Sequence, residues 1–188
     1  ATLAGHIASI PDQGLEAPAT SHGLVVRKRL GLPGAREEAQ SGFEHVRLFA
    51  LPMLLKSRKA GLSEAASQIN ALLALMATLP DTCIAHRGGL AGLQAVQSGA
   101  KQVLDLGGVG LPEGSAAYEA LCHQMEEQKL SPGGSADLLA ATLFLDRLLT
   151  FWGEERNHSL EKFMESLELK IPAGQPIKDA QVQIGVVA

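Results

Sequence analysis

Apolar residues recur every three or four positions along most of this chain, a spacing that places them on one face of a helix. The clearest run covers 64–79. Its apolar face is formed by Ile69, Leu72, Leu73, Met76 and Leu79. Ser63 is expected to cap this helix, and Gly61 separates it from an earlier helix over 43–60. Pro52 lies inside that earlier pattern, so we expect a kink or a break there.

The other helical patterns are shorter or less regular. Capping residues, apolar spacing and glycine breaks predict helices over 1–10, 22–30, 35–41, 90–106, 115–129 and 135–152. Alanine and leucine dominate these segments, and β-branched residues are sparse before the last stretch of the chain, which favours helices over strands. The sequence therefore predicts an all-α protein built as a multi-helix bundle.

The last part of the chain has a different pattern. Segments 166–171 and 180–187 alternate apolar and polar residues around a turn rich in proline and glycine at 172–176, which is typical of two short strands. We therefore expect a helical domain over 1–156, followed by a linker and an extended or β-like tail over 157–188. A disordered C-terminus is the alternative interpretation of the same residues.

Composition narrows the classes of function. A net charge of −4 over 188 residues indicates neither a nucleic-acid partner nor an anionic membrane surface, and no apolar run is long enough to span a bilayer. Cys83 and Cys122 match neither a disulfide framework nor a metal-ligand spacing, and no signal peptide is recognised, so we expect a cytoplasmic location. Two basic groups, at 27–29 and 56–59, are interpreted as solvated helix faces or as substrate contacts.

The first cluster with chemical potential runs from Ser131 to Asp137, reads Ser-Pro-Gly-Gly-Ser-Ala-Asp and leads directly into an apolar helix. A hydroxyl residue occupies the expected N-cap, and a helix start presents unpaired N–H groups with the positive end of the helix dipole. Gly133 and Gly134 would let a ligand approach this backbone closely, so the segment suits an anion such as phosphate. The alternative is a simple turn before a core helix.

The second cluster covers 81–89 and reads Asp-Thr-Cys-Ile-Ala-His-Arg-Gly-Gly. If it is helical, His86 lies one turn after Thr82 on the same face. Arg87 precedes a glycine pair, which suits a phosphate or a carboxylate, and Asp81 suits a hydrated magnesium ion or a general base. The alternative is that Asp81 only caps the helix and that the other polar residues are ordinary surface groups.

Together the two clusters resemble the triphosphoribosyl-dephospho-coenzyme A synthase family. The likeness rests mainly on 131–142 and on 81–89. It extends to Ser21-His22-Gly23, where the family usually has Thr-His-Gly, and to the segment 34–43. In that segment Glu37 stands where a glycine is expected.

The resemblance covers about residues 15–152 and is strongest to the form that serves malonate decarboxylase, while a related form serves citrate lyase. It implies that ATP and 3′-dephospho-coenzyme A are the substrates. The triphosphoribosyl group of ATP is transferred to a hydroxyl of the second substrate and adenine is released. It further implies a magnesium ion and a product that becomes the prosthetic group of an acyl carrier protein. An oxocarbenium-like transition state at the anomeric carbon would be helped by a nearby carboxylate.

Placing this chemistry on the two clusters gives the expected site. The expected catalytic residues are Asp81, His86, Asp137, His22 and Glu38. The residues expected to bind the nucleotide are Arg87, Gly88, Gly89, Ser131, Gly133, Gly134 and Ser135. Asp81 and Asp137 are also expected to bind magnesium or to stabilise the developing cation, and His86 or His22 to act as base or leaving-group acid. The remaining histidines, expected at the surface or in packing, are His6, His45, His123 and His158.

Two features depart from the family pattern. Full-length members carry an additional N-terminal part with its own motifs, so this chain is expected to represent the C-terminal portion, with activity that depends on the missing part. The tail over 164–187 resembles the beginning of the malonate decarboxylase acyl carrier subunit. That resemblance indicates either a fusion of two reading frames or a sequence that runs across a gene boundary. A non-catalytic helical module that binds a nucleotide or a carrier protein is the alternative function, and a nucleotide hydrolase is a third.

Overall fold

The computed structural model describes residues 30–155. Within this range every regular element is a helix and no strand is present, so the predicted all-α class is confirmed. The helices expected over 1–10 and 22–30, the candidate His22 and the two strands of the tail lie outside the described residues.

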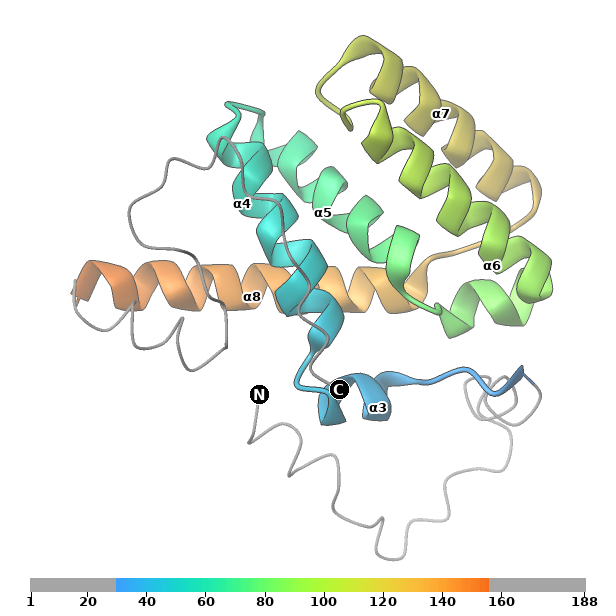
Figure 1. Ribbon diagram of the computed structural model, residues 1–188, viewed down its shortest axis with the longest axis horizontal. Helices are drawn as coiled ribbons and strands as arrows, with labels where there is room; N and C mark the ends of the chain where they lie inside the picture. The colour runs from blue at the N-terminus through green and yellow to red at the C-terminus, as the bar shows by residue number, and fades with distance from the viewer. Residues whose placement is uncertain (1–29, 156–188) are drawn as a thin grey trace, which may run out of the picture.

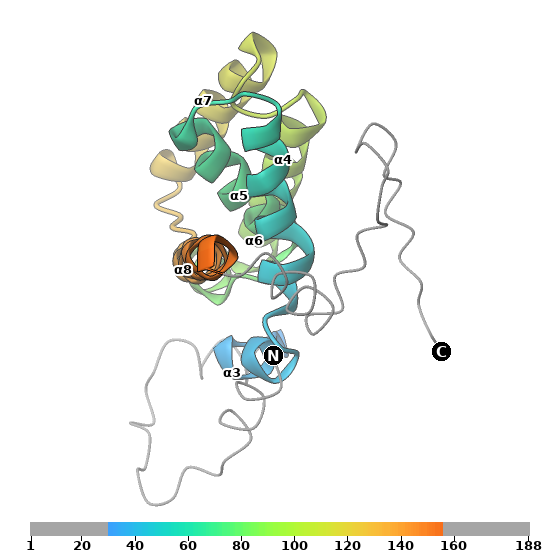
Figure 2. The same ribbon diagram turned by 90° about the vertical axis from the view of Figure 1, so that its left-hand side faces the viewer.

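The elements follow one another with short connections. They are α3 (Ala35–Gln40), the π-helical turn η1 (Val46–Ala50), α4 (Leu51–Lys59), α5 (Glu64–Thr78), α6 (Thr82–Asp105), α7 (Pro112–Glu127) and α8 (Gly133–Glu155). Figure 1 shows α4, α5, α6 and α7 side by side, with α8 running across the lower part of this layer. In Figure 2, α8 is seen end-on and lies on the other side of α5 from α4. The central helix is therefore α5, which packs against α4, η1, α6 and α8.

Two groups of apolar side chains form the core on either side of α5. The larger group joins α5, α6 and α7 and consists of Leu73, Met76, Ile84, Ala85, Leu93, Val96, Ala100, Val103, Leu121, Met125 and Leu130. The smaller group joins α4 and α5 to α8 and consists of Ala50, Leu54, Ala71 and Leu75, covered by Leu138, Leu139 and Leu143. Because α5 contributes to both groups, its wide apolar face fixes where α6 and α8 lie.

The start of α5 and the region around Pro52 show how local sequence sets the elements. The Ser63 side chain accepts a hydrogen bond from the Ala66 N–H at 3.2 Å, which confirms it as the N-cap. Pro52 is the second residue of α4, which continues from the π-helical turn in one helical segment over 44–59. The predicted irregularity is therefore present as a π turn. Proline has no N–H to donate to the regular helical pattern, and the π turn accommodates this without a break in the helix.

An ion-pair network ties α4 to the first turn of α5 and to α8. The Arg58 guanidinium donates to Asp146 Oδ1 at 2.8 Å and to both oxygens of Glu64 at 2.7 Å. These bonds hold the pKa of Arg58 above its usual range and lower the pKa of Glu64 to about 2. Because Asp146 is buried, this pairing fixes the position of α8 on the bundle. Within the basic group 56–59, Arg58 is thus engaged in the fold.

Helix α6 begins earlier than the predicted 90–106. It starts at Thr82 and bends at Gly89, whose φ of 63° and ψ of −166° interrupt the helical geometry. The second sequence cluster is therefore helical, and it forms the first two turns of α6. The bend exists because glycine alone adopts this backbone conformation without strain.

No single helix within residues 30–155 combines the length and the apolar composition needed to cross a bilayer. Helices α5 and α6, which are bent by 58° at the break between them, meet that requirement only as a pair.

Replacing Gly89 by alanine is expected to lower the free energy of unfolding by about 1–3 kcal/mol, because a Cβ strains the backbone at this φ and ψ. Urea unfolding followed by circular dichroism measures the change. The exposed Ser98, changed to alanine on the same helix, serves as the control and should shift stability by less than about 0.5 kcal/mol. Equal stability of Gly89→Ala and the unmodified chain would show that the bend is unstrained.

Candidate functional site

One buried carboxylate joins the two sequence clusters. Asp81 Oδ1 accepts hydrogen bonds from the Cys83 N–H at 2.9 Å and the Ile84 N–H at 3.4 Å, which caps the start of α6. Asp81 Oδ2 accepts two more, from the N–H and the hydroxyl of Ser135, at 2.8 and 2.9 Å. Asp81 is 1% exposed and Ser135 is fully buried. The two clusters, 54 residues apart in the sequence, therefore lie side by side.

The position of this carboxylate has an electrostatic cause. The first turns of α6 and α8 each present unpaired N–H groups and a positive dipole end, and a negative charge is stabilised at such a place. Asp81 is the N-cap of α6 and also meets the first turn of α8, so one charge serves both helices. The anion that the sequence predicted at the start of α8 is, in this structure, the protein's own carboxylate.

The glycines of the first cluster lie in close packing at this junction. A Cβ on Gly134 would lie 3.3 Å from the Asp81 carboxyl atoms, and one on Gly133 would lie 2.8 Å from the Cys83 sulfur. The helix begins at Gly133, two residues before the predicted start at 135, so Ser135 lies in its first turn. The packing is sufficient to explain the pair of glycines without a ligand.

The surface around the junction carries the remaining polar candidates. His86 and Arg87 are exposed on the first turns of α6, and Asp137 is exposed on α8. Arg87 Nη1 lies 3.4 Å from the carbonyl oxygen of Lys129, just before the Ser131 turn. The guanidinium of Arg87 is therefore held close to the connection between α7 and α8.

The glycine pair of the second cluster has two different roles. A Cβ on Gly88 would lie 2.7 Å from a methyl group of Leu130, so this position must be small for the α7–α8 connection to pack on α6. Gly89 faces open space and provides the bend described above. Both glycines thus shape the junction, and neither role depends on a bound nucleotide.

The two carboxylates predicted to bind magnesium, Asp81 and Asp137, differ in whether their oxygens are already engaged. All four hydrogen bonds to Asp81 come from the protein, so its oxygens are already engaged and do not fit a direct metal ligand. Asp137 is exposed and fits the outer contact that a hydrated magnesium ion on a phosphate requires. Over residues 30–155 no group of three or more His, Cys, Asp and Glu side chains is placed to hold a metal ion.

Glu38 belongs to a second polar contact, on the side of α3. Its carboxylate accepts the His45 N–H at 2.9 Å and contacts His45 Nδ1 at 2.7 Å. The Glu38 hydrogen bond is the largest cause of a raised His45 pKa, opposed by burial and supported by a hydrogen bond to the backbone of Thr78. Because Thr78 ends α5 three residues before Asp81, this pair is close to the junction of α6 and α8.

His45 is the residue that sequence reasoning missed. We expected it at the surface or in packing, yet it is half-buried and bonded to a buried carboxylate. The contact depends on consecutive left-handed residues, Gly42 (φ 73°) and Phe43 (φ 58°), which turn the chain back toward α3. The available signal was Gly42, two residues before the helical segment that begins at residue 44, and it does not specify the partner. His123, by comparison, is exposed as expected.

Comparisons with known proteins match this region. A family model described as CitG, ATP:dephospho-CoA triphosphoribosyl transferase, matches residues 3–156. The 2-(5''-triphosphoribosyl)-3'-dephosphocoenzyme-A synthase of Klebsiella pneumoniae is 50% identical over 148 residues, which are 79% of this chain and 52% of that protein. A probable synthase of the same name from Pseudomonas syringae pv. syringae (strain B728a) is 50% identical over 145 residues, 77% of this chain and 50% of its own. The chain thus spans about half the length of the curated relatives it matches. No solved structure matches.

Removing the carboxylate of the junction should destabilise the whole bundle. Asp81→Ala is expected to lower the free energy of unfolding by about 2–4 kcal/mol, because two helix starts lose their acceptor. Ser135→Ala is expected to lower the free energy of unfolding by about 1 kcal/mol. In a double-mutant cycle, the two substitutions should show a coupling energy of about 0.5–3 kcal/mol. Asp137→Asn on the same helix is the control and should change stability little. Additive effects of the Asp81 and Ser135 substitutions would contradict the contact.

The His45–Glu38 pair makes stability depend on pH. Because the folded pKa of His45 is raised, its contribution is fully present below the unfolded value of 6.5 and is lost as pH rises through the folded pKa. His45→Gln should therefore be less stable than the unmodified chain at pH 5.5 by about 1.5–3 kcal/mol, the range for a hydrogen bond to a charged group. Unfolding curves measured from pH 5.5 to 8.5 should show this difference shrinking. His123→Gln should show no such trend; a constant difference for His45→Gln would refute the coupling.

Proposed function

The chain belongs to the CitG family of ATP:dephospho-CoA triphosphoribosyl transferases, and on this premise we propose that it transfers the triphosphoribosyl group of ATP to 3′-dephospho-CoA. In this reaction the bond between ribose C1 and adenine N9 breaks, and a bond forms between C1 and a hydroxyl oxygen of dephospho-CoA. The hydroxyl loses its proton, and adenine leaves with a proton on N9. The observation that carries the proposal is the Asp81–Ser135 contact, which brings the two motif clusters of the family-matched region together.

The triphosphate needs cations and N–H donors. We assign this role to the exposed guanidinium of Arg87 and to the first-turn backbone of Gly133 and Gly134, with Ser131 at the edge of the same turn. The Ser135 N–H, also predicted for this role, is used by Asp81. Magnesium would arrive with ATP and neutralise charge on the triphosphate.

The chemical step needs a carboxylate and a proton-transfer group. We assign stabilisation of the positive charge developing at C1 to Asp137, because it is the exposed carboxylate next to the α8 start. Proton transfer is assigned to His86, which is exposed one turn into α6, with His22 as the alternative outside the described residues. Glu38 stays a candidate through its pairing with His45. A base or metal role for Asp81 requires it to give up hydrogen bonds to the helices.

The finer assignment is to the malonate decarboxylase system in the cytoplasm, where the product would become the prosthetic group of an acyl carrier protein. What supports it is the sequence of 131–142 and the likeness of 164–187 to the beginning of the acyl carrier subunit. This assignment would be tested by converting the product to the loaded carrier with the later enzymes of that system.

A second candidate is a non-catalytic module that binds a nucleotide or a carrier protein. The observation that favours it is that all four hydrogen bonds to Asp81 come from the protein, so this carboxylate serves the fold. Nucleotide binding without release of adenine would support this module over the transferase.

Incubating the full chain with ATP, magnesium and 3′-dephospho-CoA is expected to release free adenine, measured by chromatography. Asp137→Asn should reduce the rate by about 10²–10³-fold, the usual loss for one preorganised electrostatic contact, without changing the unfolding midpoint. Glu119→Gln, an exposed substitution on α7, is the matched control and should retain full activity.

The alternatives give different products. Release of inorganic phosphate without adenine would indicate a nucleotide hydrolase. Near-normal turnover of Asp137→Asn would remove Asp137 from the site while leaving the transferase assignment in place.

A further inference from the structure

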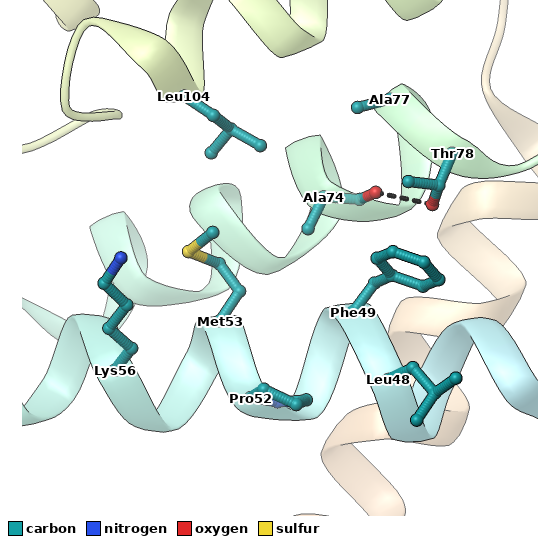
Figure 3. A pocket seen from close by; sticks show the side chains of 9 residues that line it. All are labelled: Leu48, Phe49, Pro52, Met53, Lys56, Ala74, Ala77, Thr78 and Leu104. Carbon is teal, nitrogen blue, oxygen red and sulfur yellow. Dashed lines mark hydrogen bonds between the residues drawn. The ribbon is translucent and has the colours of Figure 1, made fainter. Parts of the chain in front are cut away.

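An apolar groove lies between η1–α4 and α5, and it has no role in the site described above. Its volume is about 240 Å³, and it is open to solvent along one side. Figure 3 shows Met53 and Leu104 pointing into it from opposite walls, with Ala74 to one side of them. The residues that line it are Leu48, Phe49, Pro52, Met53, Lys56, Ala74, Ala77, Thr78 and Leu104.

One end of the groove adjoins the Glu38–His45 pair. The Phe49 ring, which lines the groove, lies 5.8 Å from the His45 ring between centroids. The groove therefore runs from a polar pair near the α6–α8 junction along α4 to Lys56, over about 12 Å at 1.5 Å per residue.

The walls select the kind of ligand. Almost all lining atoms are carbon, and the Thr78 hydroxyl already donates to the Ala74 carbonyl at 2.8 Å (Figure 3). A base or a phosphate placed between these walls would lose its hydrogen bonds to water without gaining others. The volume is also below the roughly 300–1,000 Å³ of pockets that enclose a complete drug-sized ligand. A narrow, largely aliphatic arm fits these limits.

We propose that this groove binds the pantetheine arm of 3′-dephospho-CoA, an inference that rests on the proposed function. The dimethyl and methylene carbons of the arm lie against Met53, Ala77 and Leu104, and its amides face the open side and remain hydrated. The nucleotide end of the substrate then lies at the His45 end of the groove, toward the α6–α8 junction. The thiol end lies toward Lys56, whose ammonium is at the far end of the same wall.

The test compares two ligands that differ only by the arm. Calorimetric titration with 3′-dephospho-CoA and with ADP, the same nucleotide without the pantetheine, measures what the arm adds to affinity. The unmodified chain should bind 3′-dephospho-CoA more tightly than ADP. Leu48→Glu places a charge in the groove wall. It should weaken dephospho-CoA binding by about tenfold, which corresponds to the lost burial of roughly two CH₂ groups, and it should leave the affinity for ADP unchanged.

The matched control is Leu55→Glu, a change of similar exposure on the same helical segment but outside the groove. Leu48 is 48% exposed and Leu55 is 43% exposed, so both variants should fold. A second pair of variants adds a bulky side chain instead of a charge. Ala77→Phe should block the arm, whereas Ala65→Phe, exposed on the same helix outside the groove, should not.

Adenine release measured in parallel separates this inference from the proposed function. If dephospho-CoA binding depends on Leu48 and Ala77 but no adenine forms, the groove assignment holds and the activity does not. If adenine forms while the groove variants bind dephospho-CoA normally, the activity holds and the groove assignment is wrong. Equal affinity of the unmodified chain for ADP and dephospho-CoA, or the same loss in Leu55→Glu, also overturns the groove assignment.

Discussion

The arrangement of this bundle depends on one carboxylate shared by two helix starts. Asp81 accepts two hydrogen bonds from the first turn of α6 and two from Ser135 in the first turn of α8. A single buried negative charge is stable there because both positive dipole ends and four donors surround it. A Cβ at Gly134 would lie 3.3 Å from the carboxylate, so a side chain there would push the carboxylate aside.

The candidate site is arranged around the Asp81 carboxylate. With Asp81 buried, the polar candidates at the surface of the junction are His86, Arg87 and Asp137. They place an imidazole, a guanidinium and a carboxylate on two helices that the Asp81 contact joins. The buried residues therefore hold the geometry, and the exposed ones face the solvent beside them. Such a division suits a reaction in which positioning and charge stabilisation supply most of the catalysis.

The second polar contact, between Glu38 and His45, joins the site to the rest of the bundle. His45 packs on Phe49 of the π-helical turn, and this turn packs on α5. Through these contacts α3, η1 and α5 meet at one place, which is also where the apolar groove begins. A nucleotide end and an aliphatic arm of one substrate would thus encounter adjacent surfaces of different polarity.

The sequence by itself determined the all-α class and the position of α5, because apolar spacing, the Ser63 cap and the break at Gly61 are local signals. It also identified both motif clusters and the family, since these depend on residue types at short spacing. Only the tertiary structure decided what the clusters contact. Asp81 meets Ser135 across 54 residues, and His45 returns to Glu38 through a left-handed turn that includes Phe43, a residue with no preference for it. Such pairings follow from how the helices pack around α5, and no local pattern specifies them.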